Sequence, residues 1–436
     1  MADAEGSCSP TRGPAGSGPL ALVVAIAAGA LVLGTMLRNG PIGSVNDGSR
    51  WDTVWALVER GTYVIDGSPW DTIDKVKRGE HFYSSKPALL PTMVAGEYWL
   101  IRHLTKWRLP EQTEQVVRTI LFTINIVPLM LYIYLYGSFL QRHVQDPWWR
   151  AFWLVAAAFG TYVTGYSSTF NNHTVAAWSV LFALYCLLRI LYEDVRSPLH
   201  FALAGFFAAF TVPNELPAAI FLVLVFVLLL RVAPRQTLLY ALPAALIPVA
   251  GYAITTYAST GTLVPYYAGL KTPLYQYEGS YWRNPTGIDA LHEPKHIYLF
   301  NMLIGHHGIF SLVPVNILAA VSMGLMLARR VRQMPLLGWL GFIVSVVVLG
   351  FYTFDTNNYG GGADGLRWTI WMIPLWMCIG PLGTDVYGRK RWVRALAVVA
   401  LFMSVMSVTR ALPNPWTKPW LEDLAEKRGW INYYPD

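Results

Sequence analysis

The stretch LALVVAIAAGALVLGTML at residues 20–37 decides the fold class, because it is 18 residues long and carries no charged side chain. A helix needs about 20 mostly apolar residues to cross the hydrocarbon core of a bilayer. The run is too long and too poorly terminated for a cleaved signal peptide, so we expect it to remain as a membrane anchor. Residues 1–18 are rich in Gly, Pro and Ser and are expected to form a disordered cytoplasmic tail.

Comparable apolar runs recur along the whole chain. The stretch from Phe201 to Leu230 is longer than one span, and the polar and proline-rich segment Pro213–Pro217 divides it into two. The composition agrees, with 54% hydrophobic and 14% charged residues. The sequence therefore predicts an all-α polytopic membrane protein with about 11 transmembrane helices, whose remaining spans begin near Val116, Ala151, Thr174, Leu238, Ile309, Leu336, Thr369 and Ala395.

The net charge of +7 does not indicate a nucleic-acid partner, because the basic residues form short clusters between apolar runs and not one patch. The three cysteines are scattered, which gives no sign of a disulfide framework or of a cysteine metal cluster. No glycine-rich dinucleotide motif or P-loop is visible, so no nucleotide cofactor is expected.

The basic clusters set the orientation. One or two apolar runs separate each basic cluster from the next cluster along the chain. If two spans lie between consecutive clusters, all clusters fall on the same face of the membrane, and this face should be cytoplasmic. With a cytoplasmic N-terminus, an even number of spans must precede Arg142, and the runs that begin near Leu20 and Val116 already make two. Residues 87–104 are therefore expected to form a helix along the outer interface and not a span. The transmembrane domain would cover 19–410, with a first outer loop at 39–115 and an extracytoplasmic tail at 411–436. The clusters are Arg142/His143/Arg150, Arg196, Arg231/Arg235, Arg329/Arg330/Arg332 and Arg389/Lys390/Arg391/Arg394.

The predicted outer segments hold most of the reactive side chains. Asp47 follows the first span, and the apolar residues from Trp51 to Val58 recur at helical spacing, which predicts an amphipathic helix on the membrane surface. An acid would thus be held at membrane depth. The alternative is that Asp47 or Ser49 only caps this helix.

Lys86 begins the second interfacial helix, next to Tyr83, Ser84 and Ser85. A cation beside hydroxyl groups at the headgroup level suits a lipid phosphate. The alternative is a lysine that only extends its amine from a helix end into water.

Together these motifs resemble the first outer loop of the GT-C superfamily of membrane glycosyltransferases, and within it the protein O-mannosyltransferase and lipid A aminoarabinose transferase group. The motifs are Asp47, Arg50 and Trp51, then Gly61–Val64, then Lys86-Pro87 followed by two leucines. The resemblance covers about the first hundred residues. It implies that Asp47 is the catalytic base and that Lys86 contacts the phosphate of a lipid-linked donor. Arg50, which belongs to the same motif, and Tyr83, whose hydroxyl lies beside Lys86 in the sequence, are further substrate-binding candidates.

The chain also departs from that family's pattern. It has Gly48 where an acid is frequent, Ser85 where glutamate is frequent, and Ala88 in place of a second proline. The missing acids weaken the case for a metal. A divalent cation remains possible, and which metal it would be is unknown.

Further substrate-binding candidates lie in the later outer segments. Asn171, Asn172 and His173 occupy the second outer loop, where the family often has an acid and this sequence has none nearby. Helix capping is the alternative for this segment, and Asn172 and His173 are the substrate-binding candidates. His306 and His307 are adjacent, so on a helix they would point apart and make a poor metal pair. Asp364 and Arg367 meet the top of a span, where Arg367 could bind a phosphate or simply anchor at the interface.

The sequence therefore predicts an inverting glycosyltransferase of the cytoplasmic (inner) membrane, with its active site on the extracytoplasmic side. The expected donor is a mannose-like or pentose sugar on a polyprenyl phosphate, and the acceptor is a lipid, a glycan or a protein. Two alternatives stay open. A transporter or flippase of lipid-linked sugars would place polar residues at mid-membrane depth, and a non-catalytic assembly subunit would not need Asp47, Arg50 and Lys86 together.

Overall fold

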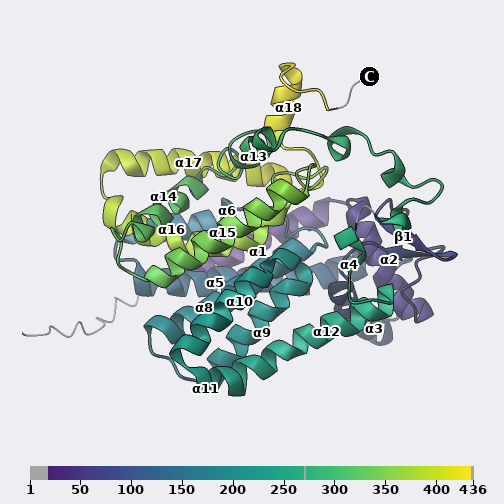
Figure 1. Cartoon of the computed structure of the whole chain (residues 1–436), viewed down its shortest axis with the longest axis horizontal. Coiled ribbons are helices and arrows are strands. Elements are labelled where there is room, and N and C mark those ends of the chain that lie inside the picture. The colour runs from purple at the N-terminus through teal and green to yellow at the C-terminus, as the bar shows by residue number, and fades with distance from the viewer. Residues whose placement is uncertain (1–17, 270–271, 434–436) are drawn as a thin grey trace, which may run out of the picture.

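The computed structural model describes residues 18–269 and 272–433 of the chain. The long helices run side by side along the long axis of the molecule, and the short elements gather mainly at its ends (Figure 1). Residues 1–17, expected to form a disordered tail, lie outside the described residues, and helix α1 begins at Gly18.

Within the described residues, six helices are long and apolar enough to cross a membrane. Their outer faces expose large apolar side chains such as Val23, Ile247 and Phe402, as lipid contact requires. The chain is therefore a multi-pass membrane protein. The six are α1 (Gly18–Arg38), α4 to α5 (Thr113–Leu121, a π-helical turn η1 at Phe122–Ile126, Val127–His143), α8 (Asn172–Tyr192), α11 to α12 (Pro234–Gln236, η3 at Thr237–Ala241, Leu242–Thr260), α15 (Pro335–Asp355) and α17 (Arg391–Ala411).

The other five predicted spans correspond to helices that do not meet the length and apolar character of these six. Two of them, η2 with α10 and α14, are apolar but have fewer than 18 residues. The count of eleven spans therefore remains a prediction. The five are α6 (Pro147–Phe159), α9 (Pro198–Asn214), η2 to α10 (Leu216–Ala218, Ala219–Val232), α14 (Val315–Leu327) and η8 to α16 (Arg367–Met372, Ile373–Tyr387).

The first outer loop contains two helices and a hairpin. Helix α2 (Val45–Arg60) begins where Ser44 Oγ accepts the backbone N–H of Asp47, and it ends at Gly61, whose φ of 67° is the left-handed conformation that closes a helix. Strands β1 (Lys75–Arg78) and β2 (His81–Ser84) pair antiparallel, a feature the sequence analysis did not predict. Helix α3 (Leu89–Thr105) packs on α2 and confirms the expected second helix of the loop.

The remaining elements are short and connect the long helices. They are α7 (Tyr162–Gly165), four 3-10 turns η4 to η7 (Tyr266–Gly269, Pro273–Tyr275, Tyr281–Arg283, Gly287–Ala290), α13 (Lys295–Leu303) and α18 (Trp420–Lys427).

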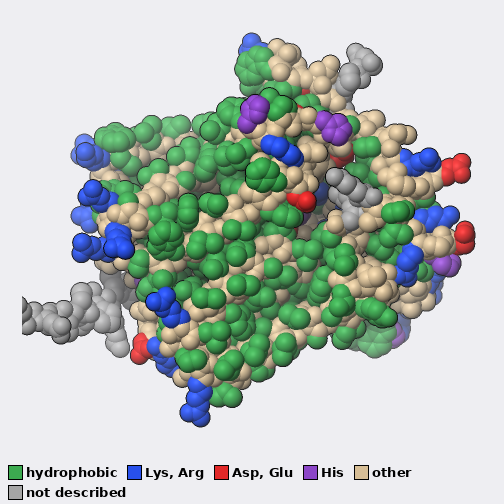
Figure 2. Space-filling view, viewed as in Figure 1, with side chains coloured by type: hydrophobic (Ala, Val, Ile, Leu, Met, Phe, Trp, Pro, Cys, Tyr) green, Lys and Arg blue, Asp and Glu red, His purple; other side chains and the backbone are tan. Residues whose placement is uncertain are grey.

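The predicted basic clusters do share one end of the bundle. Gln333 Nε2 donates to the carbonyl of His143 at 3.1 Å, the Arg142 guanidinium lies 3.2 Å from Glu193, and Arg394 pairs with Asp146. Figure 2 shows Lys and Arg side chains at that end and a broad apolar band beside them. The assignment of this end to the cytoplasm remains a prediction.

The predicted outer segments meet at the opposite end. Asn39 Nδ2 donates to the carbonyl of Pro413 at 3.0 Å, Ser168 Oγ to that of Leu412 at 2.7 Å, and the Asp364 N–H to that of Pro415 at 2.8 Å. The segment after α17 thus joins the ends of several helices that are far apart in sequence.

Candidate active site

Asp47 lies in the first turn of α2 with only 1% of its surface exposed. Trp416 Nε1 donates to its Oδ1 at 3.1 Å and the Gly43 N–H to its Oδ2 at 3.4 Å. Since Ser44 is the N-cap, the alternative in which Asp47 or Ser49 caps the helix is wrong. Burial raises the pKa of Asp47 to about 7, despite the opposing effect of Arg50 and of these hydrogen bonds.

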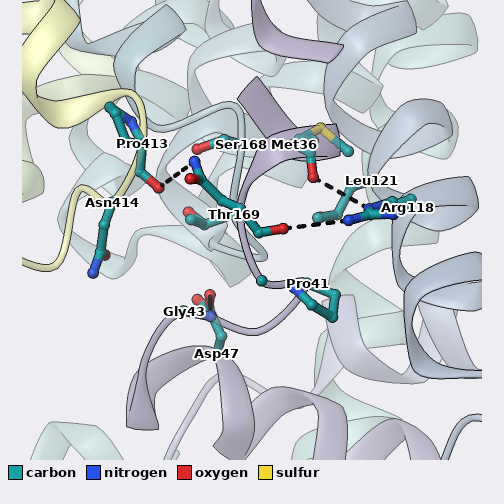
Figure 3. A pocket seen from close by; sticks show the side chains of 12 residues that line it. Met36, Pro41, Gly43, Asp47, Arg118, Leu121, Ser168, Thr169, Pro413 and Asn414 are labelled. Atoms are coloured by element: carbon teal, nitrogen blue, oxygen red, sulfur yellow. Dashed lines mark hydrogen bonds between the residues drawn. The ribbon is translucent and has the colours of Figure 1, made fainter. Parts of the chain in front are cut away.

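A small hollow opens beside Asp47. Figure 3 shows Asp47 on one side of it, with Arg118 from α4 and Asn414 from the C-terminal segment facing it. Arg118 is held there by its Nε donating to the carbonyl of Met36 at 3.2 Å. A carboxylate with a pKa near neutrality thus borders a space that a small polar group could enter.

Lys86 is paired with an acid that the sequence analysis missed. Its Nζ lies 2.7 Å from Asp74 Oδ2, and the two side chains are only 13% and 11% exposed. Burial would raise the pKa of Asp74, but Lys86 lowers it overall, with help from Arg367 and Arg50. Burial lowers the pKa of Lys86 to about 8, and Asp74 opposes this shift. Lys86 is therefore a largely buried lysine whose charge is balanced by Asp74, and it does not extend into water.

The hairpin explains how Asp74 reaches Lys86. Lys75 pairs with Ser84, so the residues just before β1 and just after β2 lie side by side. Ser49 Oγ on α2 donates to the Asp74 carbonyl at 2.6 Å and ties the hairpin to the helix. Two short runs on either side of Gly79-Glu80 are a pattern that predicts a β-hairpin in the sequence. A hairpin predicted there would have placed Asp74 beside Lys86.

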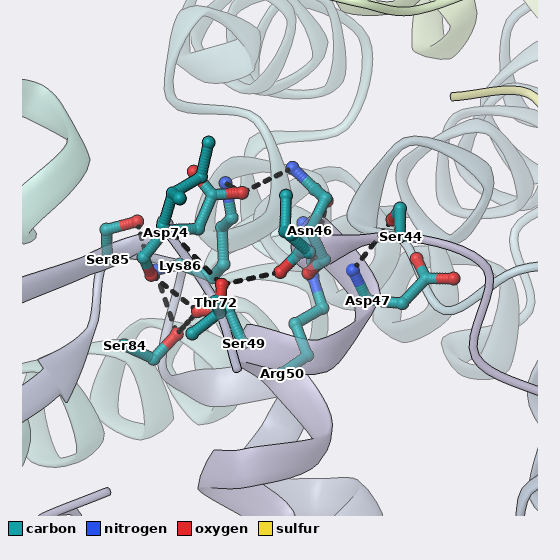
Figure 4. A network of polar contacts seen from close by, with 12 residues as sticks. Ser44, Asn46, Asp47, Ser49, Arg50, Thr72, Asp74, Ser84, Ser85 and Lys86 are labelled. Atoms are coloured by element: carbon teal, nitrogen blue, oxygen red, sulfur yellow. Dashed lines mark hydrogen bonds and ion pairs between the residues drawn. The ribbon is translucent and has the colours of Figure 1, made fainter. Parts of the chain in front are cut away.

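A second small hollow opens on the Lys86 side of α2. It is lined by the end of the hairpin, the start of α3 and the end of α12, with Tyr83 and Lys86 among its walls. The Tyr83 hydroxyl accepts a hydrogen bond from the Arg78 guanidinium at 3.2 Å. Figure 4 shows that Asn46 and Arg50 lie between the Asp74 and Lys86 pair and Asp47.

Arg50 connects α2 to two other segments and is only 2% exposed. Its guanidinium donates to the carbonyl of Asn46 at 2.9 Å and to the side chain of Asn172 at the start of α8. Asn172 Nδ2 in turn donates to Glu215 Oε1 at 3.0 Å, and His173 Nδ1 bonds the same carboxylate. Glu215, in the turn between α9 and α10, is therefore a buried acid in contact with both Asn172 and His173.

Helix capping falls to a neighbour of Asn172. Asn171 is the N-cap of α8, and its side chain accepts the Thr174 N–H at 2.9 Å. Asn172 and His173 are left free of that role, and both are buried.

Arg367, at the start of η8, adds a third cation. Its guanidinium lies 5.1 Å from the centre of the Trp416 ring, and its field lowers the pKa values of both Arg50 and Lys86. Its Nε atom is buried with no hydrogen-bond partner among the described residues. Asp364 does not join these cations, since its Oδ1 accepts the Tyr162 hydroxyl at 2.8 Å.

The adjacent histidines form a separate group. The expectation that His306 and His307 lie on a helix and point apart is wrong, because α13 ends at Leu303 and both residues lie in the turn that follows. Their Nδ1 atoms are 2.6 Å apart. Gly305 and Gly308 flank the pair, and glycines there were a readable sign that the helix stops.

Comparison with known proteins gives a fold-level similarity without a family assignment. No protein-family model and no curated protein matches the chain. Among solved structures, the crystal structure of ArnT from Cupriavidus metallidurans bound to undecaprenyl phosphate is similar, with a TM-score of 0.47 and 11% sequence identity. The match covers 92% of this chain and 77% of the ArnT chain. At this identity, a functional assignment depends on the residues of the site.

Proposed function

We propose that this protein is an integral-membrane glycosyltransferase that moves a sugar from a polyprenyl phosphate to an extracytoplasmic acceptor, with inversion at the anomeric carbon. The observation that carries the proposal is a buried Asp47 with a pKa of about 7, next to a cluster of three cations. A general base works best when its pKa lies near the operating pH. The cations Arg50, Lys86 and Arg367 suit a phosphate leaving group.

The reaction is a displacement at the anomeric carbon. The acceptor, bound in the hollow beside Asp47, gives its proton to the Asp47 carboxylate as its oxygen or nitrogen bonds to the sugar. The bond from the anomeric carbon to the phosphate oxygen breaks, and the electron pair leaves with the polyprenyl phosphate. We place the sugar–phosphate bond at Arg50, because this side chain lies between Asp47 and Lys86.

The hollow beside Lys86 suits the phosphate end of the donor. The phosphodiester of the donor carries one negative charge and gains a second as the sugar leaves, so it favours the protonated form of Lys86 and competes with Asp74 for it, most strongly as the leaving phosphate forms. Tyr83 and Pro87 form part of the same walls, and the apolar face of α3 next to them can take the start of a lipid chain. A lipid-linked donor also agrees with the absence of any nucleotide-binding motif from the sequence.

The position of the buried ionisable groups favours an enzyme over a transporter. Asp47, Asp74, Glu215 and Arg50 belong to segments at one end of the bundle, and Asp385 bonds the backbone of residues 145–146 at the other. A transporter of lipid-linked sugars is expected to hold such groups near mid-membrane depth.

Vesicles that contain the purified protein, with an extract of membrane lipids, glycans and proteins as the source of the acceptor, would test the proposal with two donors, polyprenyl-phosphate mannose and a polyprenyl-phosphate pentose. If the protein transfers sugar, the labelled sugar leaves the lipid and free polyprenyl phosphate accumulates. The Lys86→Ala variant should raise the KM for the donor. Movement of the intact donor between leaflets, with no cleavage of either donor, would identify a transporter and refute the proposal.

A further inference from the structure

A second buried polar cluster lies apart from the cations, where the C-terminal segment meets the turn after α13. It contains His306, His307 and Glu422, the last from helix α18. One ligand atom from each side chain lies within 4.8 Å of the other two. His307 and Glu422 have no exposed side-chain surface, and His306 is 5% exposed.

Hydrogen bonds fix which ring nitrogens carry protons. The hydroxyls of Tyr359 and Tyr433 both donate to Glu293, the latter at 2.7 Å. The Tyr433 oxygen lies 2.8 Å from His306 Nε2, so this nitrogen must be the donor in that contact. In a neutral imidazole the other nitrogen, His306 Nδ1, then presents a lone pair, and it accepts from His307 Nδ1 at 2.6 Å.

This arrangement of protons leaves His307 and Glu422 without a favourable contact between them. His307 Nε2 also presents a lone pair, and it faces Glu422 Oε2 at 3.6 Å, which is too long for a hydrogen bond. The Nε2 atom and both carboxylate oxygens are buried without hydrogen-bond partners among the described residues. A buried lone pair facing a buried carboxylate is unfavourable unless a cation or a proton lies between them.

The chemistry of the three ligands selects the cation. Two imidazoles and one carboxylate are a donor set that zinc and similar divalent transition metals accept. The Nε2 contact of His306 with Tyr433 and Glu293 is the kind of outer contact that orients metal-bound histidines.

We propose that His306, His307 and Glu422 bind one divalent transition-metal ion, and that this ion fastens α18 to the turn between α13 and α14. Binding uses the two ring nitrogens that present lone pairs, His306 Nδ1 and His307 Nε2. It requires the rings to rotate, because His306 Nδ1 must give up the hydrogen bond that it accepts from His307 Nδ1. The site is distinct from Asp47 and its cations, and nothing in the proposed transfer reaction depends on it.

Zinc binding can be measured on the purified full chain without any sugar donor. After removal of metals with a chelator, the parent protein is expected to bind one Zn²⁺ per chain, and X-ray absorption should show nitrogen and oxygen ligands at about 2.0–2.1 Å. Glu422→Gln keeps the size of the side chain and should weaken binding at least tenfold, as should His307→Ala. Tyr433→Phe, which alters only the outer contact, should weaken it about tenfold.

His296→Ala is the matched control, because His296 is exposed on α13 a few residues away. It should bind zinc like the parent. Zinc should also slow proteolysis of the segment after Ala411 in the parent and the control but not in Glu422→Gln. The proposal is overturned if the stripped parent binds no zinc with a stoichiometry of one, or if Glu422→Gln and His307→Ala both bind as tightly as His296→Ala. Neither result bears on the proposed sugar transfer, which the donor-cleavage assay tests separately.

Discussion

The pair of Asp74 and Lys86 gives a prediction that separates structural from functional roles. Asp74→Asn removes the charge that lies 2.7 Å from Lys86 Nζ but keeps the shape of the side chain. Lys86 then remains 13% exposed with no counter-charge in contact, and its pKa, already about 8, must fall further. At neutral pH the lysine becomes largely neutral or stays charged at a cost in stability.

The size of the effect follows from the burial of both groups. Removing one partner of a buried ion pair costs about 3–5 kcal/mol, and we expect the lower end, about 3 kcal/mol, because Lys86 can lose its proton. Replacing both partners, as in Asp74→Asn with Lys86→Met, removes the uncompensated charge and should recover most of this loss. The coupling in the double-mutant cycle should be about 2 kcal/mol or more.

Unfolding in detergent by added denaturant measures these differences for the parent, both single variants and the double variant. Donor KM is measured alongside. We expect stability to recover in the double variant while donor use stays poor, because Lys86 is still missing. Equal stability of Asp74→Asn and the parent, or losses that simply add in the double variant, would show that the pair does not act as described.

Three further predictions concern orientation and proton transfer. In a Cys8→Ser background, a cysteine at Asn357 should react with an impermeant thiol reagent from outside and one at Gln333 should not; both positions are exposed, whereas Ser49 is buried and unsuited to labelling. Since Asp47 must be deprotonated to act as a base and Lys86 protonated to bind the phosphate, kcat/KM should rise with pH through about 7 and fall again above about 8, and a flat profile from pH 5 to 9 would contradict this. Trp416→Phe removes a hydrogen bond that lowers the pKa of Asp47, so this rise should move to higher pH, by up to about one unit for a bond worth roughly 1 kcal/mol.

The long helices were predictable because their signal is local. An apolar run such as 20–37 has one stable form in a bilayer, and α1 covers it from Gly18 to Arg38. The gathering of the basic clusters at one end was also predictable, since it depends only on counting spans. The exact number of spans was harder, because several helices are shorter than the apolar runs that contain them.

The site was predictable only where its residues are neighbours in sequence. Asp47 and Arg50 share one turn of α2, whereas the contact of Asn172 with Glu215 joins residues 43 positions apart. No local pattern encodes such a contact, since it depends on how α8 and α9 pack. The same holds for Trp416, which is 369 positions from Asp47 and donates a hydrogen bond to it. Nothing in the sequence indicates that Asp47 has this partner.

The most direct test of the account is the rate of sugar transfer by Asp47→Asn, measured in single turnover with the enzyme in excess over the donor. Asn can still accept the Trp416 N–H, so the protein should unfold at the parental denaturant concentration while transfer falls about 10²- to 10⁴-fold. Asp52→Asn is the matched control, because Asp52 is also buried on α2 with a pKa raised by burial to about 7 but does not line the hollow beside Asp47. It should transfer sugar at a rate close to that of the parent. Near-parental transfer by Asp47→Asn, or an equal loss in both variants, would contradict the assignment of Asp47 as the base.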